Sequence, residues 1–270
     1  MFWTFRRVSW WAAGAVAVLA TVAPGAANAQ TDYYNLDAGR PLRVEDALVI
    51  ERHALEWQVA PLRFSGIRWR GTGLAVEPEL AWGALPRTQV EIGVPVVRGA
   101  GPGHVIGAAG VDVSVLHALN AETITWPALA ISLGALTPAG PYGPDRTLAT
   151  VGAIATRTLR AGRIHVNVAA TPGSASGRVP DEASRWRVGI AGDRTFVVQS
   201  TLVGADLVAE RPLGGGDVQW SAALGMRRQL GPRSAIDLGM GRRITGEGEW
   251  FVTAGSALSF GLLHRFGGVK

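Results

Sequence analysis

Residues 89–96 read QVEIGVPV, and the surroundings of the two faces of this stretch decide the fold. Side chains alternate between the two faces of an extended chain, so one face is valine and isoleucine throughout and the other carries Gln89 and Glu91. In a soluble sandwich the aliphatic face would point into the core. In a membrane barrel it would meet lipid, and Glu91 would face the interior. The rest of the chain has to distinguish these two architectures.

The first residues have the pattern of a secretory signal. Arg6 and Arg7 precede an apolar run that extends to about Val22, and small residues at 27–29 suit cleavage. We therefore predict a signal peptide over residues 1–29. A retained membrane anchor is the alternative, but the apolar run is short for a span and ends in a Pro-Gly pair.

The composition excludes several classes of protein. The chain has no cysteine, so its fold must hold without disulfides after export. Removing the signal removes Arg6 and Arg7, so 24 of 26 basic residues remain against 21 acidic ones, and this scattered surplus argues against nucleic acid as a partner. No group of histidines has the spacing of metal ligands, so we expect no metal and no cofactor.

About twelve segments alternate apolar with small or polar residues, and each is close to the length of about 9 to 11 residues with which a tilted strand crosses a bilayer. They lie at 53–64, 74–83, 88–97, 107–118, 126–136, 147–159, 163–171, 185–192, 196–208, 217–229, 233–242 and 249–266. Pro61 and Pro78 interrupt the first two, and there we expect a bulge or a local loss of pairing.

The links between these segments alternate in length. The short link 160–162 is followed by the longest one, 171–184, and then by the predicted turn 192–195. Such alternation is typical of a barrel with an even number of strands, long outer loops, tight periplasmic turns and both termini in the periplasm. We therefore predict an all-β transmembrane barrel, antiparallel and up-and-down, over residues 53–270, surrounded by the lipid of a bacterial outer membrane.

The aromatic residues provide a second test, because they concentrate at both membrane interfaces. If the first strand runs outward, one group falls at periplasmic strand ends and the other at outer strand ends. The periplasmic group is Trp57, Trp82, Trp126 and Phe266, and the outer group is Trp186, Trp220 and Trp250. The sequence therefore predicts two aromatic girdles.

Charged residues that face the predicted interior are unevenly distributed. Acids come from the first four strands and arginines from later ones, with a single late acid as an exception. The predicted lumen-lining residues are Glu56, Glu77, Glu79, Glu91, Asp112, Arg163, His165, Asn167, Arg187, Arg227, Asp237 and Arg265. In a closed barrel the two groups form opposite walls. The lumen is then either a polar passage with a transverse field or an interior closed by ion pairs, since arginine pairs bidentately with carboxylates.

The predicted lumen shows no catalytic constellation. His117 and Ser114 lie on opposite faces of one strand, and His165 has no serine at a spacing that would place a nucleophile beside it. A barrel protease would need clustered acids paired with histidine at the lumen mouth, and the sequence shows no such cluster. We therefore predict no catalytic residues and no enzyme.

The last strand is similar to the C-terminal strand by which outer-membrane barrels are recognised for insertion. It is apolar at Leu258, Phe260 and Leu262 and places Phe266 as the terminal aromatic, which implies the barrel assembly machinery as a partner. His264 stands where an apolar residue is usual, and four residues follow Phe266, so the sequence departs from that pattern.

Two stretches resemble the outer-membrane family labelled after the MetA pathway of phenol degradation. They are NLDAGRPLRVEDALVIER at 35–52 and PRTQVEIGVPVV at 86–97. The resemblance implies a barrel that moves aromatic or other hydrophobic compounds, without established catalytic residues to carry over.

The segment before the first strand has two possible structures. Residues 30–52 form a periplasmic segment that folds as one helical turn or enters the lumen as a plug, and the sequence does not separate these. Passive passage of a small-molecule solute is the leading function. A structural or interaction barrel with a closed lumen is the alternative, and a lipid-modifying enzyme the third.

Overall fold

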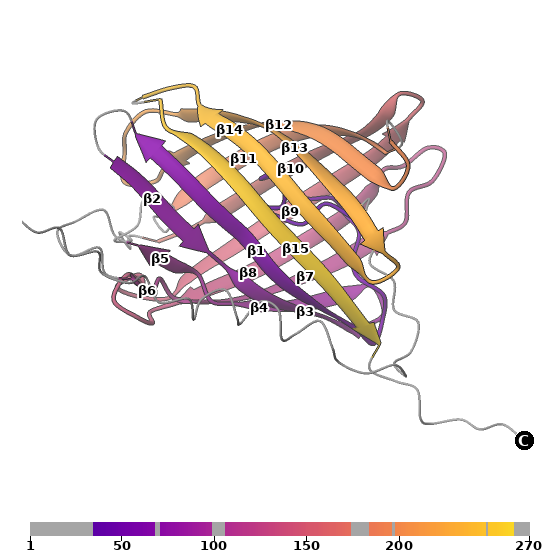
Figure 1. The fold of residues 1–270 in the computed structure, drawn as a ribbon, viewed down its shortest axis with the longest axis horizontal. Helices are drawn as coiled ribbons and strands as arrows, with labels where there is room; N and C mark the ends of the chain where they lie inside the picture. The colour runs from indigo at the N-terminus through magenta and orange to yellow at the C-terminus, as the bar shows by residue number, and fades with distance from the viewer. Residues whose placement is uncertain are drawn as a thin grey trace, which may run out of the picture.

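The computed structural model describes residues 35–67, 71–98, 106–173, 184–195, 198–246 and 248–261. These residues form fifteen strands joined by turns and loops (Figure 1). The strands are β1 (Ala54–Ile67), β2 (Gly71–Val76), β3 (Pro78–Leu85), β4 (Thr88–Gly93), β5 (Val96–Arg98), β6 (Ile106–Ala108), β7 (Val111–Asn120), β8 (Ala128–Thr137), β9 (Leu148–Leu159), β10 (Gly162–Thr171), β11 (Arg185–Thr195), β12 (Thr201–Pro212), β13 (Gln219–Gly231), β14 (Ser234–Arg243) and β15 (Trp250–Gly261). In the described part of the chain, no helix is long and apolar enough to span a membrane.

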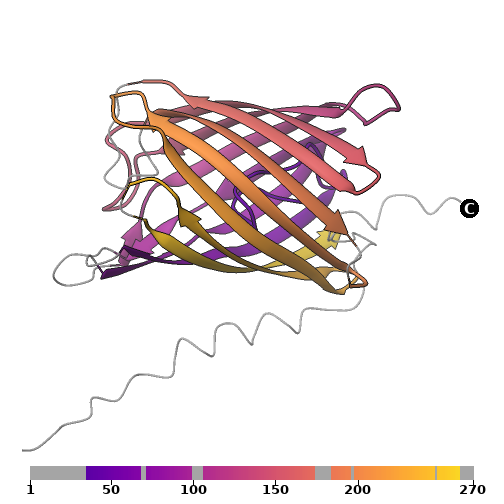
Figure 2. The ribbon, with the colours of Figure 1, turned by 90° about the horizontal axis from the view of Figure 1, so that it is seen from above.

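The fifteen strands make a closed barrel of twelve. β1 pairs with β3 along its first half and with β2 along its second, so β2 and β3 are two halves of one interrupted strand. β4 with β5, and β6 with β7, are related in the same way. β15 pairs with β1 and closes the ring, with Ala54 opposite Gly261 (Figure 2). The predicted antiparallel barrel of about twelve strands is confirmed.

Both ends of the barrel sequence lie at one end of the ring. We call this the terminal end, where Ala54 meets Gly261, and the other the far end, where β1 finishes. That arrangement follows from an even number of up-and-down strands. The periplasmic position of the termini stays a prediction.

Proline accounts for two breaks in the ladder, because it lacks the N–H that a ladder requires. The register of β1 against β15 shifts between Val59 and Leu62, which is the bulge predicted at Pro61. β2 and β3 are separated at Glu77, directly before Pro78. Both predicted irregularities are confirmed.

The largest error in the predicted boundaries concerns one hairpin. Residues 192–195 were expected to form a turn, but β11 continues through Thr195, where Asp193 and Thr195 pair with Gly204 and Leu202 of β12. The predicted strand 196–208 is therefore displaced to 201–212. The turn prediction is wrong because the ladder extends farther toward the terminal end than the local polarity suggests.

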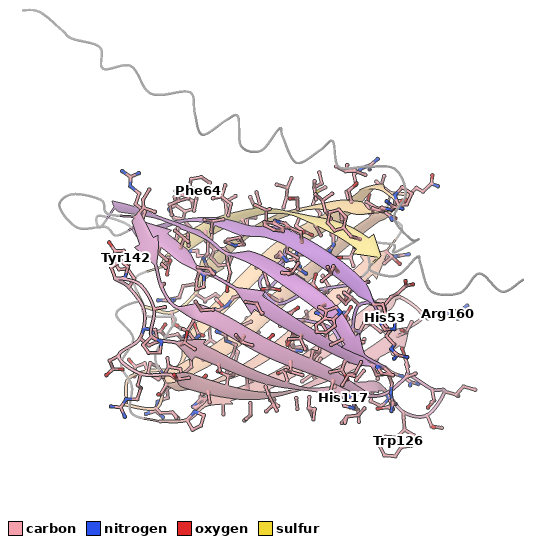
Figure 3. All side chains as sticks on the ribbon, turned by 90° about the horizontal axis from the view of Figure 1, so that it is seen from below. His53, Phe64, His117, Trp126, Tyr142 and Arg160 are labelled. Carbon is pink, nitrogen blue, oxygen red and sulfur yellow. The ribbon has the colours of Figure 1, made fainter. Side chains whose placement is uncertain are left out.

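The barrel is polar inside and apolar outside. In β4, Ile92 is 50% exposed and Gln89 is 2% exposed. The same inversion holds farther along the chain, where Leu224 is 61% exposed and Arg227 only 1%. Side chains project from the whole outer surface of the ring (Figure 3). A soluble sheet would reverse this pattern, so the outer surface is suited to lipid.

The aromatic residues of the two predicted girdles lie at opposite ends of their strands. Trp126 lies at the terminal end together with His53, and Phe64 lies at the far end (Figure 3). The strand positions place Trp57 and Trp82 near the terminal end, and Trp186, Trp220 and Trp250 at the far end. Phe266 lies outside the described residues.

Replacing Leu224 by arginine is expected to lower the free energy of unfolding in a bilayer by about 2–4 kcal/mol, because Leu224 lies midway along the outer face of β13. Leu213, in the turn after β12, is the matched control: it is 50% exposed, and its replacement should change stability by less than about 0.5 kcal/mol. Urea unfolding in phospholipid vesicles measures both. Equally small effects would contradict a lipid-facing surface.

Candidate functional site

Residues 35–52 lie inside the barrel and cross its lumen (Figure 2). Their backbone N–H groups bind side chains on the inner face of four separate strands. Arg43, Glu45, Ala47 and Ile50 donate to Asp206, Asn167, Thr156 and Gln89, at 2.6–2.9 Å. The wall therefore supplies hydrogen-bond acceptors that a short irregular segment cannot supply for itself.

The segment is a re-entrant loop whose two arms are joined. Leu36 N–H donates to Asp46 Oδ2 at 3.1 Å, and Asp46 N–H donates to the carbonyl of Leu36 at 3.0 Å. Asn35 and Ala54 line the same small cavity at the terminal end. Both arms therefore reach that end of the barrel, and the tip at Pro41 extends into the lumen.

Three glycines receive the tip of the loop. Gly204, Gly225 and Gly239 lie directly opposite one another on β12, β13 and β14. A Cβ at Gly225 would lie 2.7 Å from Pro41 Cβ, one at Gly239 would lie 2.6 Å from the Pro41 carbonyl, and one at Gly204 would lie 3.0 Å from Leu42 Cδ1. We call this glycine row the tip groove, because any side chain there would displace the loop.

Apolar side chains of the loop cover two patches of the inner wall. Leu36, Leu42 and Val44 pack with residues of β11, β12, β13 and β15. Farther along the loop, Ala47 packs with Leu116 and with residues of β8 and β9. These patches would be costly to leave in a water-filled lumen, so their burial stabilises the docked loop.

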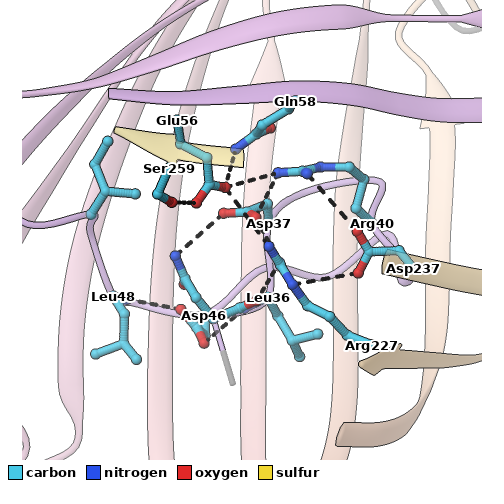
Figure 4. Close-up of polar contacts among 12 residues, drawn as sticks. Leu36, Asp37, Arg40, Asp46, Leu48, Glu56, Gln58, Arg227, Asp237 and Ser259 are labelled. Atoms are coloured by element: carbon cyan, nitrogen blue, oxygen red, sulfur yellow. Dashed lines mark hydrogen bonds and ion pairs between the residues drawn. The ribbon is translucent and has the colours of Figure 1, made fainter. Parts of the chain in front are cut away.

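The first ionic contact of the loop surrounds Arg227 (Figure 4). Its Nη1 lies 2.9 Å from Asp37 Oδ2, which is also 2.6 Å from Arg40 Nη2. Glu56 Oε1 lies 3.7 Å from Arg227 Nη2 and 3.9 Å from Arg40 Nη2. Asp237 lies 3.5 Å from Arg227 Nε and 4.0 Å from Arg40 Nη1. Two arginines thus bridge three carboxylates of the loop and the wall, all nearly excluded from solvent.

A second contact is built on β10 and β11. Arg163 forms a fork with Asp193, with Nε–Oδ1 at 3.0 Å and Nη2–Oδ2 at 2.7 Å, and its Nη1 lies 3.2 Å from Asp46 of the loop. His165 Nε2 lies 2.8 Å from Asp193 Oδ2, and its Nδ1 lies 3.0 Å from Thr156 Oγ1. The histidine thereby connects the carboxylate to the hydroxyl that binds Ala47.

A third contact holds the tip from the far-end side. Arg43 binds Glu210 bidentately, at 2.9 and 3.3 Å, and donates to Ser221 Oγ at 3.1 Å. Arg187 Nε and Arg185 Nε lie 3.4 and 3.9 Å from the same carboxylate. The loop is therefore fastened to β10–β14, which we call the late wall, along most of its length.

The opposite side of the lumen, β3, β4 and β7, is acidic and we call it the early wall. Glu77 and Glu79 converge over Gly93, where a Cβ would lie 3.1 Å from Glu77 Oε1, and Asp112 pairs with Gly93. Glu91 accepts from Ser114 Oγ at 2.8 Å and from Gln89. Among the described residues these four carboxylates form no ion pair, and all are partly exposed to solvent.

All predicted lumen-lining residues except Arg265 lie at inward-facing positions, and Arg265 lies outside the described chain. The predicted division into an acidic and a basic wall needs a correction, because the late arginines have carboxylate partners nearby. Arg163, Arg187 and Arg227 contact Asp193, Glu210 and Asp237. The late wall carries both positive and negative charges, and only the early wall carries charges of a single sign, which is negative.

Several residues of these contacts were not identified from the sequence, six charged ones among them. Asp37, Arg40 and Arg43 belong to the loop, and Asp193, Asp206 and Glu210 belong to β11 and β12. The displaced boundaries of that hairpin removed Asp193 and Glu210 from the predicted strands. Alternate residues of β12 face inward, so correct bounds for this strand would have predicted both Asp206 and Glu210 as lumen-lining residues.

Thr156, His165 and Asp193 form a hydrogen-bonded chain of the kind that activates a nucleophile. Ala47 N–H donates to the Thr156 hydroxyl oxygen at 2.9 Å, and His165 is fully buried. The loop thus covers the Thr156 hydroxyl, and the partner of these three residues in the structure is the loop. His117 contacts Thr88 Oγ1 and pairs with Ile131 on the outer face.

Burial affects two acids of the loop, which lie outside the membrane-spanning strands. Burial raises the pKa of Glu45 to about 8, assisted by the carboxylates of Glu91, Asp37 and Asp46 and opposed by Arg187. Burial also raises the pKa of Asp46 to about 6, although Arg163 acts in the opposite direction. Both acids therefore bind a proton more tightly in the docked loop than in water, and Asp46 still ionises below neutral pH to pair with Arg163.

No protein-family model matches the chain, and no curated protein matches it significantly. The resemblance to the MetA-pathway family therefore stays a prediction. Several solved structures of outer-membrane proteins share the fold. The COG4313 outer membrane channel from Pseudomonas putida F1 has a TM-score of 0.52 and 12% identity, covering 80% of this chain and 98% of its own. The KdgM porin has a TM-score of 0.50 and 9% identity, covering 76% and 98%. At these identities the likeness shows the outer-membrane barrel fold alone.

Replacing Gly225 by alanine is expected to displace the loop tip, because the new methyl group would lie 2.7 Å from Pro41. Overpacking of this kind costs about 1–3 kcal/mol. Single-channel conductance in a planar bilayer should rise. Gly134→Ala is the matched control, since it also adds a methyl group to a luminal glycine but meets no atom closer than 3.9 Å. The same conductance for both variants would argue against the tip groove.

The docked loop should weaken as the pH rises. Its acids have pKa values above their ordinary ones, so their neutral forms favour docking below about pH 4.5, and this contribution is lost as Asp46 and then Glu45 ionise up to about pH 8. Conductance at pH 9 should exceed that at pH 5. Glu45→Gln should reduce this difference, whereas Glu51→Gln, at an exposed position, should preserve it. An unchanged profile in Glu45→Gln would refute the assignment.

Proposed function

We propose that this protein is a bacterial outer-membrane barrel that allows passive passage of small solutes, beside a loop that narrows its lumen. The observation that supports it is the uneven exposure of the interior. Asp193 and Asp237, on the late wall, are 5% and 2% exposed beneath the loop, whereas Glu77 and Asp112 on the early wall are partly exposed. Water therefore reaches the early-wall carboxylates, whereas the late-wall carboxylates are buried.

The lining of this accessible side favours one class of solute. Glu77, Glu79, Glu91 and Asp112 present carboxylates on three neighbouring strands. Rings or rows of carboxylates attract cations and repel anions in a narrow pore. We infer that small cationic and neutral polar solutes pass most readily. The family resemblance implies aromatic or hydrophobic compounds instead, and a carboxylate lining is unfavourable for these.

A closed structural barrel is the second candidate, and the fastening of the loop favours it. Three separate groups of charged side chains hold the loop to the late wall. Removing a buried partner from such a group is costly, so the loop does not leave readily. This candidate predicts that a correctly folded barrel conducts nothing. Catalysis has no support among the described residues, because the one suitable histidine chain is covered by the loop.

The proposal is tested by the conductance of the refolded chain in a planar bilayer with a salt gradient. We expect discrete steps with a reversal potential of the sign given by cation flow. Glu77→Gln combined with Asp112→Asn should move that potential toward zero, since both remove charge from the early wall. Glu122→Gln is the control, because Glu122 lies in the turn between β7 and β8, outside the lumen.

One result would overturn the proposed passage, and another the inferred preference for cations. A barrel that shifts on a heated gel, and is therefore folded, but stays silent in the bilayer would favour the closed structural barrel. Discrete steps with an anion-directed potential would retain the pore and refute the role of the early wall.

A further inference from the structure

Five outward-facing residues on neighbouring strands alternate between tryptophan and arginine at the far end. They are Trp186 of β11, Arg211 of β12, Trp220 of β13, Arg242 of β14 and Trp250 of β15. Each is the first, second or next-to-last residue of its strand, and the five strands are neighbours in the wall (Figure 1). We call this set the Trp-Arg band.

The register places these side chains beside one another on the outer surface. Trp186 lies opposite Arg211, and Arg242 lies opposite Trp250. Trp220 lies between the two pairs, two residues before Ala222, which is opposite Arg242. Trp220 and Trp250 are 40% and 45% exposed, as expected for the lipid-facing side of the wall. The three tryptophans belong to the predicted outer girdle, and the two arginines extend it.

Both guanidinium groups are held above the apolar belt, at the level of the turns. Arg211 Nε donates to the carbonyl of Gly216, in the turn after β12, at 2.8 Å. Arg242 Nη2 lies beside Gly248, in the turn before β15, where a Cβ would be 3.1 Å away. Arginines placed so are suited to head groups rather than to acyl chains. The Trp250 ring covers Gly66 of β1, where a Cβ would lie 2.6 Å from Trp250 Nε1.

We propose that the Trp-Arg band binds the phosphorylated sugar head group of a lipid A-type glycolipid in the outer leaflet. Two fork-shaped guanidinium groups on alternate strands suit two phosphates, which arginine recognises bidentately. The intervening indole rings offer an apolar face to the upper acyl chains and an N–H to the polar boundary. The span of five strands suits a disaccharide with several chains better than a single-phosphate lipid.

This inference rests on the outer-membrane placement within the proposed function and not on transport. It assigns the far end of the barrel to the outer leaflet, which is compatible with a periplasmic terminal end. A barrel that conducts nothing could still bind the glycolipid, so a binding experiment fails or succeeds independently of the conductance experiment.

The test uses the refolded full chain in detergent micelles, with native mass spectrometry counting bound lipid. The probes are bisphosphorylated lipid A, its dephosphorylated form and phosphatidylglycerol. We expect lipid A to bind, and Arg211→Gln with Arg242→Gln to weaken it by about tenfold or more, as loss of charge-assisted hydrogen bonds does. Arg228→Gln is the matched control, because Arg228 is an exposed, outward-facing arginine at the terminal end of β13.

Each outcome bears on the proposal. Selective loss in the Arg211→Gln, Arg242→Gln variant supports it, provided that a heat-shift gel shows the folded barrel. If the double variant does not fold, each single variant should weaken binding by a smaller factor. Equal binding by the variant, equal binding of dephosphorylated lipid A, or equal binding of phosphatidylglycerol would each overturn the assignment to a phosphorylated glycolipid.

Discussion

Compensation of buried charge is the constraint on which the rest of the structure depends. Lipid outside requires an apolar outer face, so the alternating strands direct their polar residues inward. Arg227 is nearly inaccessible to water, and its partners come from three parts of the chain: Asp37 of the loop, Glu56 of β1 and Asp237 of β14. An uncompensated buried charge costs about 3–5 kcal/mol. The loop is therefore part of the folded barrel and not an appendage to it.

The fold could be predicted because its signal is local. In a strand that separates lipid from a polar interior, apolar and polar side chains alternate with a period of two residues. The exposed Ile92 and the buried Gln89 show this alternation. Strand ends are less well marked, because hydrogen bonding can continue into a polar stretch. Asp193 looked like a turn residue and is paired within β11, and this error concealed two of the acids that face the lumen.

The site could be predicted only in part, because its contacts join residues far apart in the chain. Arg43 and Glu210 are separated by 167 residues, and no local pattern connects them. No local pattern connects Gly204, Gly225 and Gly239 either. Their common role becomes visible only when the register places them side by side beneath Pro41. The alternation of the sequence predicts which residues face inward. Which of them contact one another is decided only when the ring closes.

The junction of β1 with β15 has a consequence for how the ring is held closed. Ser259 of β15 donates to Glu56 of β1 at 2.8 Å, and Glu56 belongs to the charged group around Arg227 and Arg40. Without the loop, Glu56 and Arg227 would lose Asp37 and Arg40 and face the water of the lumen instead. The loop therefore reinforces the seam at which the ring closes, so that filling the interior also ties the first strand to the last.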